Sequence, residues 1–379
     1  MDAHPTMFSA ATLEGRDAAT ARVAVVHDRI PLEQLDRWLE RHVRSGDVII
    51  LEASGNSFAI VERIRAKGHK AVVLESASVG KIGRAYCATD KLDAIKIARV
   101  WLSGLAHVVW TPDEKSAARR EVFFSYRNSV KDTTRARNRI WAFLNQHGLR
   151  RPRGLRMTLG CGKDRVLSLR TWTPMQQALI EDLFDALWHA EERRKKFKAI
   201  IAQEVASEEA ILQLVRLTGI RDIIAFALTA FIGDIARFRT PKNLVGYIGL
   251  NPRVSISGTG GGTGPLAHTG RSDLRALLIQ AAQSVLRYGN GTAQHRWAVA
   301  LKMRKGANVA VAALARKITV ACWYLMNGLF TPLTEVTAQL SIKLHKIACS
   351  IGAARLKESG YASISEFQHE LFQKLLSTA

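Results

Sequence analysis

Cysteine is scarce and scattered in this sequence. The four cysteines, Cys87, Cys161, Cys322 and Cys349, lie far apart, with no CxxC spacing and no cluster of histidines. This pattern excludes a disulfide framework and a zinc site built on paired cysteines. We expect reduced thiols and an intracellular protein.

Long apolar runs are missing as well. No stretch approaches about 18 uninterrupted apolar residues, the length that a membrane span needs. The N-terminus has no charged start followed by an apolar run, which excludes a signal peptide. We therefore expect a cytoplasmic protein without membrane contact, and no internal repeat is evident.

Acidic residues are in short supply. The 379 residues include 33 Asp and Glu against 55 Lys and Arg, which gives a net charge of +22 and a pI near 10.3. This charge exceeds what solubility requires and indicates a polyanionic partner, namely nucleic acid. A basic protein that only touches acidic surfaces is the alternative. The apolar content of 47% is ample for two or three ordinary domains.

The first part of the chain, to about Trp110, alternates β-rich runs with amphipathic segments, which is typical of an α/β domain with a single compact sheet. The periodicity predicts strands at Met7–Leu13, Arg22–His27, Val48–Leu51 and Ala71–Leu74. It predicts helices at Leu32–Val43, Ser57–Lys67 and Lys91–Leu105.

A strongly basic segment follows. Between Lys115 and Arg170 there are 15 Lys or Arg and 3 Asp or Glu. We take Arg135, Arg137 and Arg139 as the nucleic-acid-binding residues of this segment. The interleaved aromatics have largely helical spacing and fit a buried stripe better than base-stacking groups; they are Phe123, Phe124, Tyr126, Trp141 and Phe143.

The rest of the chain is predicted to be helical. Met175–Val215 reads as one long or once-broken helix after a Thr173-Pro174 start signal, and its length suggests a coiled-coil arm. Helices joined by glycine-rich connections follow from Leu217, and Ala307–Met326 is a further helix. The predicted fold class is α/β plus all-α, with four domains at 1–112, 113–216, 217–330 and 331–379.

Four acidic residues are candidate metal ligands. Glu52 directly follows the apolar strand at 48–51, where side chains of an open α/β sheet point into the ligand crevice. Asp90 and Asp93 stand one helical turn apart, so both carboxylates share one face. With Asp2 they form an inventory suited to magnesium or manganese in phosphoryl transfer. The alternative for Thr89–Asp93 is an ordinary capped helix start.

Ser257 is the candidate nucleophile. It opens the glycine-rich segment 257–264, in which backbone N–H groups can approach phosphate oxygens. Arg271 and Arg275 follow and could hold the same anion. Serine needs a base, a metal or strong charge to act as a nucleophile, and His268 is the nearest histidine. A flexible linker with an incidental serine is the alternative.

Together these residues resemble one family, the insertion-sequence transposases with a DEDD, RuvC-like N-terminal domain and a C-terminal serine domain, which are relatives of Piv and MooV. The family's Gly-Ile-Asp-Val-His-Lys motif looks like Met1–Pro5, its strand-plus-Glu motif like Leu51–Gly55, and its Lys-Thr-Asp-Xaa-Xaa-Asp-Ala motif like Ala88–Ala94. The serine-domain core is similar to Ile232–Phe238 and Leu244–Pro252, with the Ser-Gly falling on Ser257-Gly258.

Three departures from the family pattern stand out. Asp2 stands at the start of the chain, whereas the family has several residues before this Asp, so either the native start lies upstream of Met1 or the first strand is shortened. The family's Pro-Gly-Ile-Gly turn is Thr218–Arg221 here. The Asn of its Gly-Asn-Xaa-Xaa-Leu-Arg element is Arg271.

The resemblance implies an RNase H-like N-terminal domain, a long helical linker, a helical serine domain, and homodimers or homotetramers. It implies DNA strand cleavage and exchange in which Asp2, Glu52, Asp90 and Asp93 hold magnesium or manganese and Ser257 forms a covalent bond to DNA. It also implies a structured noncoding guide RNA, the bridge RNA, that pairs with target and donor DNA. The alternatives are a RuvC-like nuclease or junction resolvase and a decayed, non-catalytic nucleic-acid-binding protein.

Overall fold

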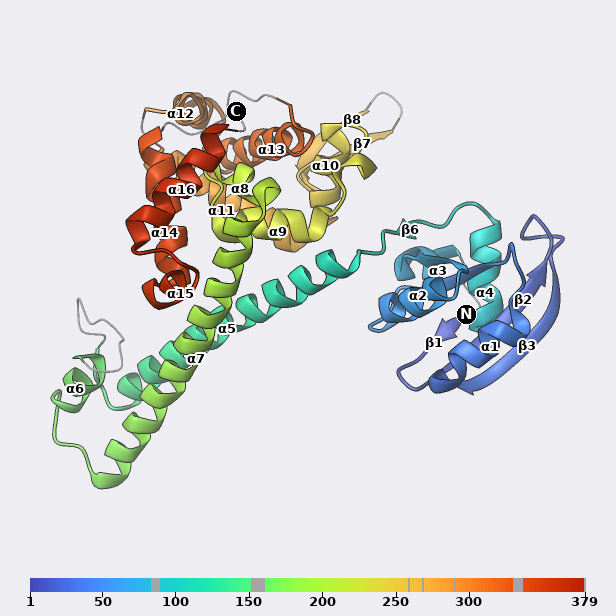
Figure 1. Ribbon diagram of the computed structural model, residues 1–379, viewed down its shortest axis with the longest axis horizontal. Helices are drawn as coiled ribbons and strands as arrows, with labels where there is room; N and C mark the ends of the chain where they lie inside the picture. The colour runs from blue at the N-terminus through green and yellow to red at the C-terminus, as the bar shows by residue number, and fades with distance from the viewer. Residues whose placement is uncertain are drawn as a thin grey trace. The chain divides into compact units, whose positions relative to one another are not determined.

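The computed structural model divides the chain into two compact units, Met1–Asp113 and Glu114–Ala379 (Figure 1). The residues that the structure describes are 1–82, 89–150, 161–257, 260–267, 269–289, 291–329 and 337–377. Each unit has its own buried core, so each is described by itself.

The first unit is an α/β layer built on two small sheets. Strands β1, β2 and β3 form an antiparallel sheet in that order, while β4 and β5 pair in parallel and β6 pairs antiparallel to β5. The elements are β1 (Asp2–Ala3), β2 (Met7–Glu14), β3 (Arg22–Pro31), η1 (Leu32–Gln34), α1 (Leu35–His42), β4 (Val48–Glu52), α2 (Ser57–Ala66), β5 (Lys70–Leu74), α3 (Ser76–Ile82), α4 (Asp90–Leu102) and β6 (Val108–Val109).

The two sheets replace the single sheet predicted from the sequence. They meet where the Met1 amino group, fully buried, donates a hydrogen bond to the Ile50 carbonyl oxygen at 2.7 Å. Burial lowers the pKa of this amino group to about 5, because a charge is poorly solvated there. The bond lays β1 beside β4.

Alternation along β4 decides which helices cover each side of the sheets. Ile49 and Leu51 pack in one core with α1 and α2, while Ile50 packs in another with α3 and α4. This follows from the two-residue period of a strand, in which successive side chains point to opposite faces. The predicted strands and helices of this unit agree with the structure to within a few residues at their ends.

The second unit is helical apart from one hairpin. Two long antiparallel helices, α5 and α7, form an arm that carries α6 near its tip, and the remaining helices gather at the other end of the arm (Figure 1). The elements are α5 (Glu114–Gln146), α6 (Cys161–Leu167), α7 (Pro174–Ser207), α8 (Glu209–Val215), α9 (Asp222–Ile232), η2 (Ile235–Arg237), α10 (Pro241–Ile248), β7 (Pro252–Ser257), β8 (Gly260–Leu266), α11 (Ser272–Tyr288), α12 (Ala293–Lys305), α13 (Ala307–Met326), α14 (Thr337–Ile351), α15 (Ala353–Glu358) and α16 (Ile364–Ser377).

Capping explains why α7 begins and ends where it does. The Thr173 hydroxyl accepts from the Gln176 N–H and the Gln176 side chain accepts from the Thr173 N–H, which is a capping box with Pro174 in the first turn. Glu208 adopts an extended conformation and separates α7 from α8. The predicted once-broken helix is therefore confirmed.

One large core joins most of the second unit. It includes Phe123 from α5 and runs through α16, crossing the boundaries predicted at residues 216 and 330. Of the aromatics predicted to be core, Phe123 is buried in this core and Tyr126 packs partly buried against it. Trp141 and Phe143 pack partly buried against a separate core at the tip of the arm, and Phe124 is 41% exposed. Separate cores thus do not mark the predicted divisions in this unit.

Helix α13 is the helix, among the described residues, whose length and composition would allow it to cross a membrane. Its inward face, which includes Leu314, Ile318 and Cys322, is buried in the large core, while Arg316 and Lys317 are exposed on its outer side. Burial raises the pKa of the Cys322 thiol to about 12, which leaves this cysteine protonated. Its contacts are those of a core helix.

The tip of the arm has a core of its own, so a substitution in that core should destabilise the tip locally. Phe184 is fully buried there between α5, α6 and α7. Phe184→Ala should cost about 3–5 kcal/mol, the usual cost of such a cavity. Leu179, on the same helix but 54% exposed, is the control, and Leu179→Ala should change stability by about 0.5 kcal/mol or less. Amide hydrogen exchange checks both, and equal effects would contradict the assigned packing.

Candidate active site

Strand β1 places Asp2 at a fixed position near the start of α4. Asp2 pairs with Ser9 and Ala3 with Phe8 in the antiparallel register of β1 and β2. Met1 and Ala3 pack against the core of α1 and α2. Since side chains alternate, Asp2 points to the opposite face, which α4 covers.

Helix α4 begins at the acidic pair that the sequence singled out. The Thr89 hydroxyl accepts from the Leu92 N–H at 3.3 Å and caps the helix, as expected for an ordinary capped helix start. The cap also sets Asp90 and Asp93 in the first turn, and α4 contacts β1, β2, β3 and β4. The capped start and the acidic site are therefore the same feature.

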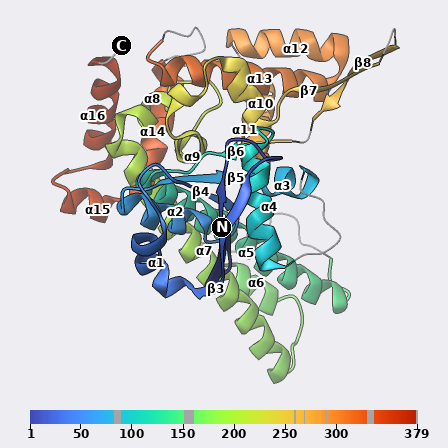
Figure 2. The ribbon, with the colours of Figure 1, turned by 90° about the vertical axis from the view of Figure 1, so that its right-hand side faces the viewer.

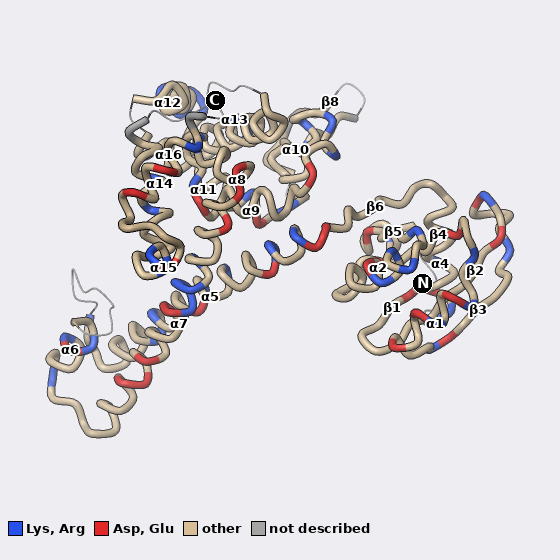
Figure 3. Tube along the Cα trace, in the orientation of Figure 1, with Lys and Arg blue, Asp and Glu red and all other residues tan. Residues whose placement is uncertain are grey.

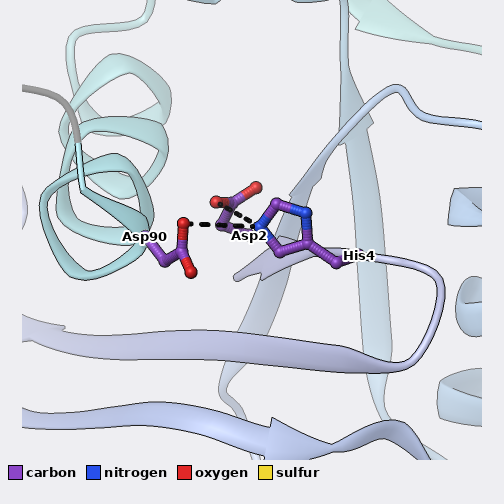
Figure 4. A group of neighbouring side chains, drawn as sticks. All are labelled: Asp2, His4 and Asp90. Atoms are coloured by element: carbon purple, nitrogen blue, oxygen red, sulfur yellow. Dashed lines mark ion pairs between the residues drawn. The ribbon is translucent and has the colours of Figure 1, made fainter.

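His4 joins the two aspartates. Its Nε2 atom lies 3.5 Å from Asp2 Oδ2 and 3.5 Å from Asp90 Oδ1 (Figure 4). The Asn56 side chain donates to the His4 carbonyl oxygen at 2.9 Å and holds the backbone here. His4 is not among the site residues predicted from the sequence. The signal was its spacing from Asp2, because residues two apart in an extended chain share a face.

The carboxylates of the cluster repel one another. Burial, first, and then the nearby charges of Asp93 and Asp90 raise the pKa of Asp2 above its usual range, while His4 lowers it. Asp93 also forms an ion pair with Lys96 at 2.5 Å. The structure thus brings Asp2, Asp90 and Asp93 into one electrostatic neighbourhood.

Glu52 lies on the same face as these acids. It ends β4 two residues after Ile50, which packs toward α4, so alternation directs both side chains to the α4 side. Its half-buried side chain makes no hydrogen bond or ion pair within the described ranges of the chain. Glu52 is therefore near β1, on the strand beside it.

Asp28 on β3 is a further acid that sequence reasoning missed. Its carboxylate accepts from the Ser9 hydroxyl at 2.8 Å and lies 3.5 Å from Lys91 Nζ of α4. The Ser9 hydrogen bond, and then Lys91, lower the pKa of Asp28. Because Ser9 and Lys91 already occupy its carboxylate, we assign Asp28 a structural role beside the cluster.

The donor set suits a divalent cation. One oxygen of Asp2, one of Asp90 and a ring nitrogen of His4 lie within 4.8 Å of one another, and all three residues are half-buried. Carboxylate oxygens suit magnesium and manganese, and a cation would offset both the burial and the neighbouring Asp93 and Asp90 charges, which together raise the pKa of Asp2. The residues present therefore fit the metal that the sequence predicts.

Ser257 is the last residue of β7 in a hairpin of the second unit. It pairs with Gly260, and the hairpin closes with Pro252 opposite Leu266. The side chain of Ser257, the residues Gly258 and Thr259, and His268 lie outside the described part of the structure. The glycine-rich segment predicted as a loop is largely strand β8, because the β7 backbone offers a ladder of partners that glycine can meet without side-chain conflict.

Close backbone contacts hold the base of this hairpin. Gly249 ends α10 with φ +80°, and a Cβ there would lie 1.8 Å from the Thr269 carbonyl oxygen. A Cβ on Gly270 would lie 2.4 Å from the Tyr247 oxygen. These glycines are required by close approach. The base of the hairpin is therefore fixed against α10 and α11.

The two arginines predicted to bind an anion help to fix this base. Arg275 donates to the Thr269 oxygen at 2.8 Å. Arg271 is half-buried over the Phe231 ring, 4.2 Å from its centroid, and pairs with Asp273 at 3.1 Å. Burial lowers the pKa of Arg271. Both residues thus have structural partners.

The arginines predicted on the arm differ in how free they are. Arg135 lies 3.3 Å from Asp132, and Arg137 lies 2.5 Å from Glu191 with its Nε buried. Arg139 is exposed and forms no ion pair with any described residue. Two of the three predicted cations are therefore partly neutralised.

Residues 212–298, which contain α9, α10, the hairpin and α11, match the model of the transposase IS116/IS110/IS902 family. Three relatives are similar over longer stretches. A Sinorhizobium fredii protein named as a transposase, y4qE, is 28% identical over 61% of this chain and 56% of its own length. A Pseudomonas aeruginosa protein named as a family 20 transposase is 28% identical over 74% of this chain and 84% of its own length.

The third relative is the transposase for insertion sequence element IS1111A of Coxiella burnetii, which is 27% identical over 52% of this chain. The similarity covers 55% of that protein, so the chain spans little more than half the length of two of these three relatives. In sequence, residues 212–298 are therefore similar to the transposase IS116/IS110/IS902 family.

Proposed function

We propose that this protein is the transposase of an insertion sequence, which cleaves and exchanges DNA strands with a divalent metal and a serine nucleophile. The observation that carries the proposal is the meeting of Asp2, His4 and Asp90, with Asp93 in the same turn of α4, in a chain whose hairpin segment matches a transposase family. The mixed strands of the first unit, with acids on the α4 face, support an RNase H-like domain.

The acids would hold magnesium or manganese. Asp2 and Asp90 would supply oxygens, with Glu52 and Asp93 on the same face, and His4 could supply a nitrogen. The metal would neutralise charge that develops on the phosphoryl oxygens. Half-burial of the cluster strengthens each of these interactions relative to bulk water.

Ser257 would carry out the covalent step. Its Oγ attacks the scissile phosphorus and loses its proton to a base, the bond from phosphorus to the 3′ oxygen breaks, and that oxygen gains a proton. The products are a 5′-phosphoserine and a free 3′-hydroxyl. Attack by the 3′-hydroxyl of another strand reverses the step and frees the serine, so no ATP is needed.

Guide RNA and assembly belong to the same proposal. We expect a structured bridge RNA to select target and donor DNA by pairing, and homodimers or homotetramers to combine acidic and serine sites. The net charge of +22 supports binding of RNA in addition to a DNA duplex. Sequencing the RNA that co-purifies from the native host tests it, and recovery of only bulk cellular RNA would count against the guide.

A hydrolytic nuclease of the junction-resolvase kind is the second candidate. The observation that favours it is that the acidic cluster lies in a compact unit with its own cores, which needs no serine to hold a metal. In that case water attacks the phosphate and free 5′-phosphates result. A decayed, non-catalytic nucleic-acid-binding protein would give neither product.

The acidic cluster should be needed for cleavage and not for folding. Asp90→Asn should lower cleavage at least about 100-fold, because a metal supplies several kcal/mol to such a step. Thermal stability should be unchanged or slightly higher at pH 7, since repulsion within the cluster is relieved. Any gain should vanish as the pH falls toward 3.8, because protonation of Asp2 removes the same repulsion.

Glu62→Gln is the control for this charge change. Glu62 is exposed on α2, away from the cluster, and its loss should alter neither cleavage nor stability. An Asp90→Asn protein that cleaves normally in magnesium removes Asp90 from the site.

The serine separates the recombinase from both alternatives. Ser257→Ala should bind DNA and RNA as before, since a hydroxyl adds little to a largely electrostatic interface, and should lose all covalent protein–DNA product. Ser255→Ala, two residues away in β7, is the matched control and should retain the product. The measurement is a denaturing gel of labelled DNA incubated with magnesium and the cognate RNA, with protease treatment of any slow band.

Two outcomes of this gel contradict the assignment. A protease-sensitive band that persists in Ser257→Ala and vanishes in Ser255→Ala moves the nucleophile to Ser255. Free 5′-phosphates without any covalent band in the wild type favour the nuclease.

A further inference from the structure

One part of the second unit has cations without acids. Leu274–Thr334 contains eight Lys or Arg and no Asp or Glu. The described portion of this segment forms α11, α12 and α13, and α12 lies beside α13 (Figure 2). Lys and Arg mark α12 in the charge-coloured trace (Figure 3). This segment differs from the basic segment Lys115–Arg170, which the composition indicated.

The arm and this segment differ in how their cations are paired. On the arm, Arg119 pairs with Glu204 and Glu208, and Lys195 pairs with Glu192. By contrast, within the described residues, the following seven cations form no ion pair: Arg287, Arg296, Lys302, Arg304, Lys305, Arg316 and Lys317. Their charge is free to act on a partner.

The exposed sides of α12 and α13 carry these cations together. Arg296, Lys302, Arg304 and Lys305 are exposed on α12, and Arg316 is exposed on α13. Lys317 Nζ lies 4.3 Å from the centroid of the Trp297 ring, which joins the two helices. We call the surface of α12 and α13 formed by these six cations the α12–α13 basic face.

Helix electrostatics account for only part of this face. Lys302, Arg304 and Lys305 stand in the last turn of α12, where the helix dipole favours a cation by about 0.3–1 kcal/mol each. Arg296 stands in the first turn, where the same dipole disfavours it, although its side chain donates to the Gly291 oxygen at 3.1 Å. Arg316 is in the middle of α13, away from either end. An external anion explains the whole set.

We propose that the α12–α13 basic face binds the phosphate backbone of duplex DNA. The complementarity is between unpaired cations and a polyanion whose charges are about 1.7 Å apart along the axis. A single strand would need open aromatic faces for its bases. Here Trp297 lies under Lys317, and Tyr324 packs edge-on against Trp323. The choice of DNA over RNA rests on the proposed function.

The test compares two charge-matched triple variants of the full chain. Arg296→Gln/Arg304→Gln/Arg316→Gln removes three unpaired cations from the face. Lys67→Gln/Arg193→Gln/Lys195→Gln removes three cations that are paired with Glu40, Asp132 and Glu192. Dissociation constants for a random-sequence DNA duplex, measured across salt concentrations, give the slope of log K against log salt.

The face variant should flatten this slope by about 0.9 for each cation that contacts a phosphate, about 2.7 if all three do. The paired variant should keep the wild-type slope. A third variant, Arg296→Lys/Arg304→Lys/Arg316→Lys, keeps the charge and should bind as the wild type, which separates lost charge from lost folding. Unfolding midpoints check that all three fold.

Three outcomes overturn the proposal. Equal flattening by the face and paired variants shows a general charge effect. If the face variant loses binding to duplex RNA while its binding to duplex DNA is unchanged, the face binds RNA. Loss of binding to phosphatidylserine vesicles alone assigns it to a lipid surface, for which the exposed Val299 and Met303 would supply the apolar contacts.

The proposed chemistry can fail independently of this face. If the wild type binds duplex DNA and forms neither a covalent product nor cleaved strands, the proposed recombinase function is wrong. The salt slopes still test whether the α12–α13 basic face binds DNA. If the face variant binds and reacts as the wild type does, only the face is wrong.

Discussion

The register of β1 is the constraint on which the acidic cluster depends. Two residues, Asp2 and Ala3, pair with β2, and the Met1 amino group reaches Ile50 of β4. A slip of one residue would turn Asp2 toward the core of α1 and α2 and replace it with an apolar side chain. Asp2 and Asp90, which are 88 positions apart in the sequence, meet at His4 because a very short strand is held from both sides.

The second unit depends on a different device, in which side chains hold backbone ends. The Tyr247 hydroxyl donates to the Phe231 carbonyl oxygen at 3.0 Å, and Arg120 and Arg237 donate to carbonyls at the end of α9. Asp273 pairs with both Arg127 of α5 and Arg271. This network fixes α9, α10 and α11 relative to α5, and with them the base of the hairpin that carries Ser257.

The features predicted correctly from the sequence are those that depend on residues close together in the chain. The strands of the first unit, the capped start of α4 and the break at Glu208 all depend on neighbouring residues, through alternation, capping and helix periodicity. These signals need no knowledge of distant contacts. The same holds for Asp90 and Asp93, whose spacing alone sets them on one turn.

The features that were missed depend on contacts between distant parts of the chain. His4 becomes part of the cluster only because α4, 86 positions later, brings Asp90 to it. The glycines of β8 become a strand only because β7 lies beside them. The single predicted sheet is two because β1, β2 and β3 form one hydrogen-bonded ladder and β4, β5 and β6 another, and strand pairing cannot be read from any strand alone.

Charge is the clearest case of this limit. A count along the sequence finds the densest cations at 115–170, yet the fold places acids of α7 against several of them, as Glu191 lies against Arg137 and Glu204 against Arg119. Around α12 the cations are fewer and no acid of the described chain meets them. A polyanion responds to charge that remains unpaired after folding, because a paired cation must first give up its acid. The binding surface therefore follows from the pairing of the charges rather than from their number.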